Sequence, residues 1–570
     1  MWPKLRNLFS RETVAADVRA GLTLGIESVP DGLAQGLLSG VNPLAGLYGY
    51  LFGMVGAAFF TSSAFMAVQA TGAMSLVVAD AGLDTRPDPD RALYTLAVLT
   101  GVIMVVAGLL GAGRLVSFVP TAVMTGFVTA VGVNIVLGQV SNFTGYPARG
   151  ENRIAKTLDA LVHLPQWNPG ATAVGVITVL TIVLLLPTRV GSMGLVVAVV
   201  VGSVSAVLLN LWVGQPIALL RDLVDVPRGL PLPVLPSFAD IVALIVPAFS
   251  LAFIAMVQGA GVSAAIPTID GKPAKPSRDF IGQGAGSILS GLFRGMPVGG
   301  SMSASALIVA AGARTRLALF IAGGVMALVV LFASDLVAYV AMPALAGLLI
   351  VVGVQAVKPI RVLSVLKTGP LQSVIMGVTF VLTLLIPLQF AVLVGVGLGI
   401  ILFVVQQSNR VRVRRVELVP GGRMRETDPP PVVPGGQVLV LQPYGSLFFA
   451  SAPTVEKQLP EPTGQSRHAA VILRLRGTDQ IGLALIAVLR RYAAQLDAVD
   501  ASLRIVASEK RVLAQLATSG LTAELGASRV YEGGEWVGDA VHRAAADAQA
   551  EIDATAASDG DADRDRPWPD

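Results

Sequence analysis

Apolar residues dominate the chain from about residue 20 to residue 405, and short polar breaks divide this region into runs. A helix needs about 20 mostly apolar residues to cross a bilayer. The runs therefore predict a polytopic α-helical membrane protein with about fourteen spans. Long runs cover 92–112, 118–138, 171–187, 191–213, 315–335, 337–354, 370–386 and 387–408; shorter or glycine-broken runs cover 20–38, 43–60, 65–80, 239–258, 278–293 and 300–313.

Beyond Arg410 the pattern changes to that of a small α/β domain. Apolar β-rich runs alternate with segments of helical spacing, which predicts a mixed sheet with helices packed on it. Strands are expected at 437–442, with 446–450 as a continuation, at 469–475 and at 502–507, and helices at 483–496 and 509–518.

These patterns divide the chain into five segments. They are a cytosolic N-terminus (1–19), a transmembrane transport domain (20–408), a basic and Pro/Gly-rich linker (409–435), the α/β domain (436–550) and an acidic, disordered tail (551–570). Lys and Arg concentrate in the cytoplasmic loops of membrane proteins. Because basic residues lie before the first span and after the last, we expect both termini in the cytoplasm; these are Lys4, Arg6, Arg11, Arg19 and the cluster Arg410–Arg415.

The amino-acid composition argues against several classes of function. Only 14% of the residues are charged and the mean hydropathy is +0.71, whereas about a quarter of a soluble chain is charged. There is no Cys, and the three His residues are scattered, so we expect no metal, no cofactor and no thiol catalysis. We find no phosphate-binding loop for ATP and no nucleic-acid motif. The basic run after Arg410 suits an anionic lipid surface, and the Ala- and Arg-rich composition favours a bacterial inner (plasma) membrane.

Two short segments, 65–75 and 295–305, interrupt the apolar pattern at matching places, seven spans apart. Each has an extended or Gly/Pro-rich approach followed by the start of a helix rich in small residues. Interruptions at matching places in the two halves of a membrane domain indicate a transporter site near the midplane of the bilayer. A helix that starts inside the membrane presents free N–H groups and a positive dipole end, so two of them facing each other can bind an anion. The alternative is tight helix packing by small residues.

Carboxylates occur within the first span. Glu27, Asp31 and Gln35 are spaced by four residues and share one helix face, with Pro30 between them. A carboxylate in the bilayer interior is costly and usually functional, and burial favours its protonated form. We therefore predict that Glu27 and Asp31 couple transport to protons. The alternative is that they only hold neighbouring helices together.

The chain resembles the SulP anion transporter family, also called solute carrier family 26. The residues that carry this resemblance are 20–23, 29–34 and 46–48 in the first half and 295–301, 312–315 and 346–349 in the second. The resemblance implies a seven-plus-seven inverted repeat with two half-helices, divided into a core domain and a gate domain. It also implies elevator-like movement, a homodimer and a C-terminal STAS domain.

The resemblance further implies a substrate site between the starts of the two half-helices. The residues carried over are Asp31, Gln35, Gln69, Ala70, Thr71, Gly72, Gln258, Gly300, Ser301, Met302 and Ser303.

Three positions depart from the family pattern. Many members have an acidic residue where this chain has Gln258, so sodium coupling there is not expected. Many have Arg where this chain has Ala304, so the site lacks a fixed cation and depends more on helix dipoles. The turn 479–482, which in kinase-regulated STAS proteins holds a Ser, reads Asp-Gln-Ile-Gly here. We therefore expect this domain to fold, dimerise or anchor rather than to act as a phospho-switch.

The prediction is a secondary active transporter of small anions (bicarbonate, sulfate, chloride or dicarboxylates), coupled to protons, and not an enzyme. Three alternatives stay open at this point: a nucleobase permease of the same fold, an uncoupled anion channel, and a membrane-tethered scaffold that does not transport.

Overall fold

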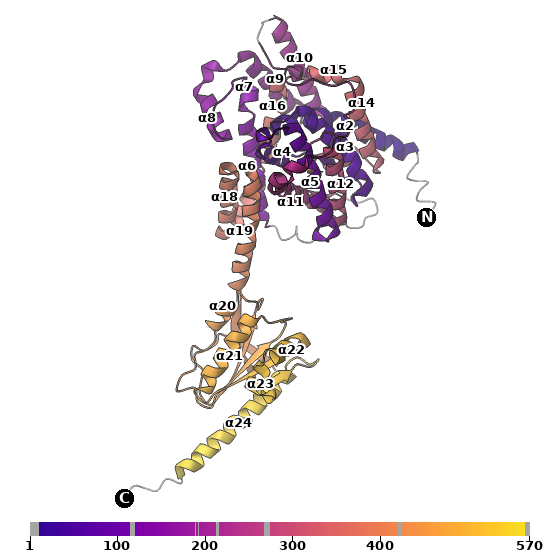
Figure 1. The fold of residues 1–570 in the computed structure, drawn as a ribbon. Coiled ribbons are helices and arrows are strands. Elements are labelled where there is room, and N and C mark those ends of the chain that lie inside the picture. Colours follow the sequence, from indigo (N-terminus) through magenta and orange to yellow (C-terminus); the bar gives the residue numbers. More distant parts are fainter. Residues whose placement is uncertain are drawn as a thin grey trace. The chain divides into compact units, whose positions relative to one another are not determined.

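The computed structural model describes residues 11–113, 120–188, 190–191, 193–212, 216–266, 274–419 and 423–564 (Figure 1). The chain forms two units, Met1–Gly399 and Ile400–Asp570. The first unit is almost entirely helical, and the second holds a six-stranded sheet.

One group of helices in the first unit packs around two very short strands. Helix α2 packs against α3 and α14, and α12 packs against α3 and α5. Small residues allow this close packing: a Cβ added to Gly46 would lie 1.9 Å from the carbonyl oxygen of Gly32. The group comprises α2 (Arg11–Leu38), α3 (Pro43–Phe60), β1 (Val68–Gln69), α4 (Gly72–Ala79), α5 (Pro89–Leu109), α11 (Ile241–Ala265), α12 (Pro276–Leu292), β2 (Gly299–Gly300), α13 (Met302–Ala310) and α14 (Leu317–Phe332).

The other helices of this unit form a second group, in which α16 packs against α6, α9 and α10, and α18 packs against α6. Its members are α6 (Thr121–Gly138), α7 (Val140–Thr144), α8 (Arg153–Val162), α9 (Pro169–Leu185), α10 (Met193–Trp212), α15 (Ser334–Ala338), α16 (Met342–Ala356), α17 (Pro359–Thr368), α18 (Pro370–Leu385) and α19 (Leu388–Ser408). The family resemblance implies a core domain and a gate domain, and the membrane unit correspondingly contains two groups of helices.

Each of the fourteen predicted spans overlaps a helix of the structure. Among the described residues, six segments are long and apolar enough to cross a membrane, and three shorter apolar helices accompany them. The first helix is longer than predicted: α2 begins at Arg11 instead of residue 20, because Asp17 and Arg19 continue the helix beyond the apolar run. Lys4 and Arg6 lie outside the described residues.

The α/β unit has the strand order β4-β3-β5-β6-β7-β8. Strands β4, β3 and β5 are antiparallel, and β5 to β8 are parallel, so the prediction of a mixed sheet is confirmed. The strands are β3 (Arg412–Val419), β4 (Arg423–Thr427), β5 (Val438–Tyr444), β6 (Ala470–Leu475), β7 (Ser502–Ala507) and β8 (Val530–Glu532). The helices are α20 (Ala452–Glu456), α21 (Leu483–Asp497), α22 (Lys510–Thr518), α23 (Leu521–Leu525) and α24 (Asp539–Arg564).

Three predictions about this unit are wrong. The predicted linker 409–435 contains β3 and β4, because its valines alternate with arginines and Val413 and Val416 are buried. The predicted strand extension 446–450 is a turn before α20. The predicted disordered tail 551–570 continues α24 as far as Arg564; residues 565–570 lie outside the described residues.

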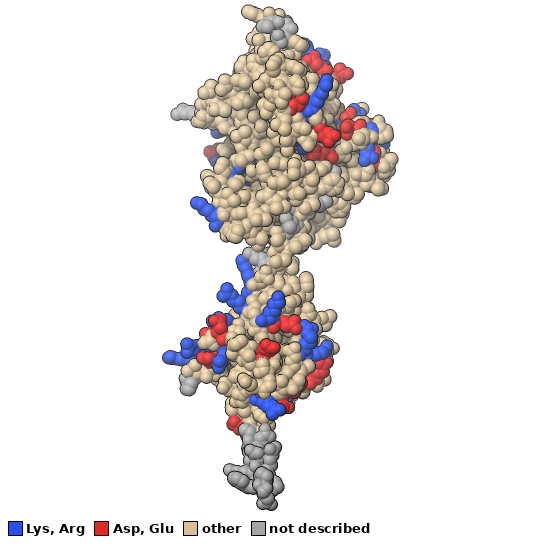
Figure 2. All heavy atoms as spheres, turned by 90° about the vertical axis from the view of Figure 1, so that its left-hand side faces the viewer, with Lys and Arg blue, Asp and Glu red and all other residues tan. Residues whose placement is uncertain are grey.

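Helices cover both faces of this sheet. Leu473 and Leu441 pack with residues of α21 and α22 on one face, whereas Ile472 packs with Val541 and Ala544 of α24 on the other. A strand covered on both faces is mostly apolar, and every residue of β6 is buried; its one charged residue, Arg474, donates to Oε1 of Gln442 at 2.9 Å. Charged side chains of both signs lie over the surface of this unit, whereas broad areas of the membrane unit carry none (Figure 2).

Candidate functional site

The two half-helices α4 and α13 start side by side because the segments before them pair. Strands β1 and β2 are antiparallel, with Val68 opposite Gly300 and Gln69 opposite Gly299. Two further hydrogen bonds extend the contact: Ser301 N donates to the Ala67 carbonyl oxygen at 2.9 Å, and Ala67 N donates to Ser305 Oγ at 2.9 Å. The chain therefore brings together two segments that lie more than two hundred residues apart.

Glycine is required in β2 because α11 passes directly behind it. A Cβ on Gly299 would lie 2.6 Å from Cβ of Ala255, and one on Gly300 would lie 2.8 Å from Cα of Gly259. The amide of Gly300 donates to Oε1 of the fully buried Gln283, at 2.8 Å. The backbone before α13 is thus held by packing and by a hydrogen bond, as a preorganised site needs.

The first turn of α4 lacks a side-chain cap. Thr71, the N-cap residue, makes no cap bond, and its hydroxyl donates to Oε1 of Gln258 at 2.9 Å. In α13, Ser301 accepts from Ala304 N at 3.4 Å, a long contact, and its hydroxyl lies 3.2 Å from that of Ser303. The amides at the start of α4 therefore remain available to an anion, together with the dipole of the helix.

Asp31 is tied to the start of α4 through a tyrosine. Its Oδ2 lies 2.6 Å from the hydroxyl oxygen of Tyr50, which lies 2.9 Å from the carbonyl oxygen of Ala70. Gln35 Nε2 approaches Oδ1 of Asp31 at 3.4 Å, while Oε1 of Gln35 accepts from Ser75. The predicted face of α2 therefore contacts α3 and α4.

Glu27 lies one turn before Asp31, and among the described residues its carboxylate has no hydrogen bond or ion pair. It is half-buried. An intramembrane carboxylate without protein partners is costly unless it faces water or carries a proton.

The predicted site residues fall into two sets. The members of the first set are buried and support the backbone: Gln35, Gln69, Ala70, Gly300 and Ser301. The members of the second set are partly or largely accessible: Glu27, Asp31, Thr71, Gly72, Gln258, Met302 and Ser303. The amide of Gln69 donates to Ser28 Oγ at 2.8 Å, so it is already occupied within the protein. The second set is the surface that a substrate could touch.

Sequence reasoning missed Tyr50 and Gln283. Tyr50 is 1% exposed and lies in an apolar helix, where an aromatic residue is expected to belong to the core. Gln283 follows the basic residues Lys275 and Arg278 in a glycine-rich stretch. A polar residue at i+4 from Asp279 was the one signal available for it.

Asp279 was also missed, and it is the most extensively hydrogen-bonded carboxylate described here. It is fully buried in the first turn of α12. It accepts from the amides and hydroxyls of Ser62 and Ser63 and from the hydroxyl of Ser263, at 2.6–2.9 Å. These bonds join the segment after α3 to α11 and α12 within the first helix group.

Asp80 links the two helix groups. It follows the last residue of α4, and its carboxylate forms an ion pair with Arg153 of α8 at 2.7 Å. The same carboxylate accepts from the amide of Leu388, the first residue of α19, at 3.0 Å. A movement of α4 relative to the second group has to break both contacts.

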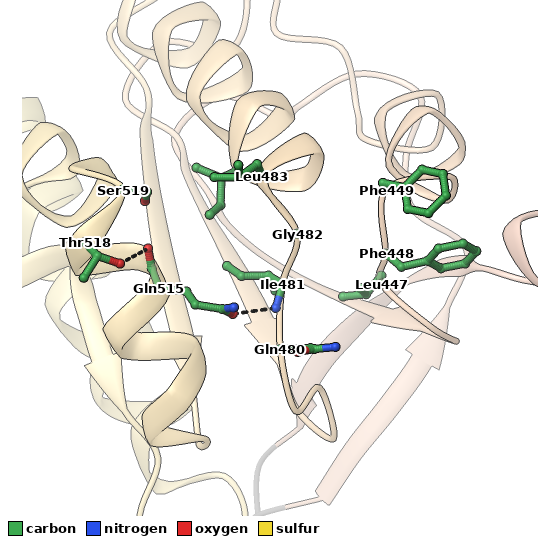
Figure 3. A pocket seen from close by; sticks show the side chains of 11 residues that line it. Leu447, Phe448, Phe449, Gln480, Ile481, Gly482, Leu483, Gln515, Thr518 and Ser519 are labelled. Carbon is green, nitrogen blue, oxygen red and sulfur yellow. Dashed lines mark hydrogen bonds between the residues drawn. The ribbon is translucent and has the colours of Figure 1, made fainter. Parts of the chain in front are cut away.

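The α/β unit has its own surface cavity of about 470 Å³ beside the turn 479–482. Gln515 accepts from Ile481 N at 2.8 Å, and Leu447, Phe449 and Leu483 contribute apolar lining (Figure 3). Phe449 and Leu483 are 68% and 80% exposed. The rim of this cavity is therefore apolar.

Within the described part of the chain, no group of three or more His, Asp or Glu side chains could hold a metal ion. Of the described acidic residues, Glu27 and Asp31 lie on α2, on the side of the half-helix starts, whereas Asp80 lies at the other end of α4.

Comparison with known proteins identifies both units. The profile of the sulfate permease family matches residues 14–385, and that of the STAS domain matches residues 430–539. The chain belongs to the sulfate permease family. This permease is 26% identical to the bicarbonate transporter BicA of Picosynechococcus sp. over 471 residues, which are 80% of this chain and 82% of BicA. It is 24% identical to sulfate transporter 4.1, chloroplastic, of Arabidopsis thaliana over 556 residues, which are 93% and 79% of the two chains.

Solved structures agree on the fold of this permease. The overall structure of SLC26A9 superimposes with a TM-score of 0.81 at 18% identity, covering 97% of this chain and 92% of that one. The transmembrane domain of a cyanobacterial bicarbonate transporter BicA gives a TM-score of 0.59 at 26% identity, covering 67% and 98%. The permease thus has the SLC26 membrane fold and a STAS domain, and its family consists of anion transporters, not enzymes.

Proposed function

We propose that this permease is a proton-coupled carrier of small anions, with its site between the starts of α4 and α13. One observation carries the proposal: the β1–β2 pair holds two helix N-termini together, beside the carboxylates of Glu27 and Asp31. Helix N-termini favour anions, and an anion has to overcome the repulsion of a carboxylate unless that carboxylate is protonated. A proton taken up by Asp31 or Glu27 therefore favours anion binding.

The substrate class follows from the charge of the site. The described residues around the starts of the two half-helices include no Lys or Arg, and Ala304 occupies the position where the family resemblance implies Arg. Dipoles worth about half a charge each suit a singly charged anion, or a divalent one accompanied by protons. Relatives include bicarbonate and sulfate transporters, so bicarbonate, sulfate, chloride and dicarboxylates are the anions to test. A proton is the proposed co-substrate, and sodium is not.

The two helix groups suggest how the carrier works. We propose that the first group carries the site past the second in an elevator-like movement and that the contacts of Asp80 are broken on the way. The protein acts as a homodimer in the inner membrane, with both termini in the cytoplasm. In this proposal the STAS domain folds, dimerises or anchors.

The test is uptake by purified protein in liposomes. Labelled bicarbonate, sulfate, chloride and fumarate are supplied separately, with and without an inward proton gradient. We expect uptake of at least one anion, increased by the gradient. Equal uptake with and without the proton gradient would favour an exchanger or a channel. Failure with all four anions, together with uptake of a labelled nucleobase, would overturn the proposal in favour of a nucleobase permease.

A further inference from the structure

The hydroxyl of Tyr50 lies within hydrogen-bonding distance of two oxygen atoms, and each of them can accept a hydrogen bond from it. One is Oδ2 of Asp31, at 2.6 Å, and the other is the carbonyl oxygen of Ala70, at 2.9 Å. Ala70 precedes the helix α4, so the hydrogen bonds within that helix do not use its carbonyl. Among the described residues, the other hydrogen bonds bring no second donor to this oxygen.

A tyrosine hydroxyl has one proton and can donate it to one acceptor only. When Asp31 is ionised, its carboxylate accepts the hydrogen bond from Tyr50, and the buried carbonyl oxygen of Ala70 is left without a donor. When Asp31 is protonated, it donates to the Tyr50 oxygen and Tyr50 donates to Ala70. The second arrangement satisfies all three groups, and a buried acceptor without a donor is costly.

We infer that Tyr50 is a positioning residue that transmits the protonation of Asp31 to the backbone of the anion site. This inference rests on the proposed function. Ala70 is followed directly by Thr71, which holds Gln258, and by Gly72, the first residue of α4. A donor gained or lost at Ala70 therefore acts on the amides that would hold the anion. By linkage, the anion then favours protonation of Asp31 by the same factor.

Few titratable groups of the described residues lie near the hydrogen-bonded pair of Asp31 and Tyr50. Glu27, one turn away, is the nearest other carboxylate of α2. Helices α4, α10, α13, α14 and α16, which pack against α2, and α11 contain no acidic, basic or tyrosine side chain. On α3, Tyr48 lies near Arg294. On α12, Arg278 and Asp279 contact the end of α3 at residues 60–63.

The experiment compares Tyr50→Phe with a matched control, Tyr48→Phe, which removes a hydroxyl two residues away on the same helix. Anion uptake into liposomes is measured from pH 5 to pH 8 without a gradient. Loss of a charge-assisted hydrogen bond should weaken the coupling of proton and anion roughly tenfold. We expect Tyr50→Phe to flatten the pH dependence of the half-saturating anion concentration, and Tyr48→Phe to retain the wild-type profile.

A wild-type pH profile in a folded Tyr50→Phe protein would overturn the inference, while gradient-driven uptake by the wild type would leave the proposed function standing. Infrared difference spectroscopy of the wild type provides a test that does not need that variant. Anion binding should increase a protonated carboxyl band that Asp31→Asn removes. A band that does not respond to the anion would also overturn the inference.

Discussion

Two aspartates in the membrane unit lie in opposite surroundings. Asp279 accepts five hydrogen bonds within 2.9 Å, from three serines on two segments of the chain. Asp31 has the shared hydroxyl of Tyr50 and a long contact with Gln35. Both sequence positions are in apolar helices, so the difference arises from what the fold brings to each carboxylate.

The number of donors separates a structural charge from an exchangeable one. A carboxylate that accepts several hydrogen bonds joins the segments that supply the donors. A carboxylate with few donors gains by taking a proton. The comparison therefore favours a structural role for Asp279 in the first helix group, and it supports the role in proton coupling that we propose for Asp31.

The largest effect is expected from removing the structural carboxylate. Asp279→Ala leaves five donors without their acceptor, three of them buried, so we expect it to destabilise the protein by about 3–5 kcal/mol. The measurement is the apparent Tm of the detergent-purified protein, with the fraction recovered as a monodisperse peak. A variant with the wild-type Tm would contradict the assignment.

The matched change at the other aspartate should leave the fold intact. Asp31→Asn keeps an oxygen for Tyr50 and removes the titrating group, so we expect a change in stability of less than about 1 kcal/mol. Uptake driven by a proton gradient should fall at least tenfold, toward the level without a gradient. Glu27→Gln tests the other carboxylate in the same assay. Unchanged proton dependence in both variants would rule out coupling through α2.

A smaller effect is expected at Asp80, a third aspartate with an intermediate number of partners. Arg153→Gln removes an ion pair whose side chains are 23% and 16% exposed. A partly exposed pair contributes about 1 kcal/mol, which corresponds to a roughly fivefold shift between conformations. Because the chain has no Cys, a single Ser303→Cys reports on access to α13. We expect Arg153→Gln to change the labelling rate of this cysteine, because the two helix groups then lose one contact that holds them in the described arrangement.

The control for this change is Arg228→Gln. Arg228 pairs with Asp335 at 2.8 Å, but both side chains are more than 70% exposed, and such pairs contribute little. Equal labelling rates in the Arg153→Gln and Arg228→Gln variants would show that Asp80 does not hold the two helix groups together.

The sequence predicted the spans and the paired half-helices because both depend on local signals, apolar length and Gly/Pro interruption. It did not reveal Tyr50 or Asp279, since their roles depend on partners up to 217 residues away. Strand β3 had a local signal, the alternation of Val and Arg, but its charge suggested a membrane-facing linker. Helix α24 was missed because its acidic residues outweighed its many alanines, which favour helix.

The most direct test of proton coupling is to follow both species at once. Liposomes containing the permease and a luminal pH dye receive chloride, sulfate or fumarate at equal pH on both sides; bicarbonate is left out because CO₂ crosses lipid. If protons accompany the anion through Asp31, entry of a transported anion acidifies the lumen with the wild type, whereas Asp31→Asn abolishes the acidification. Anion uptake by the wild type with no change in luminal pH would contradict the account.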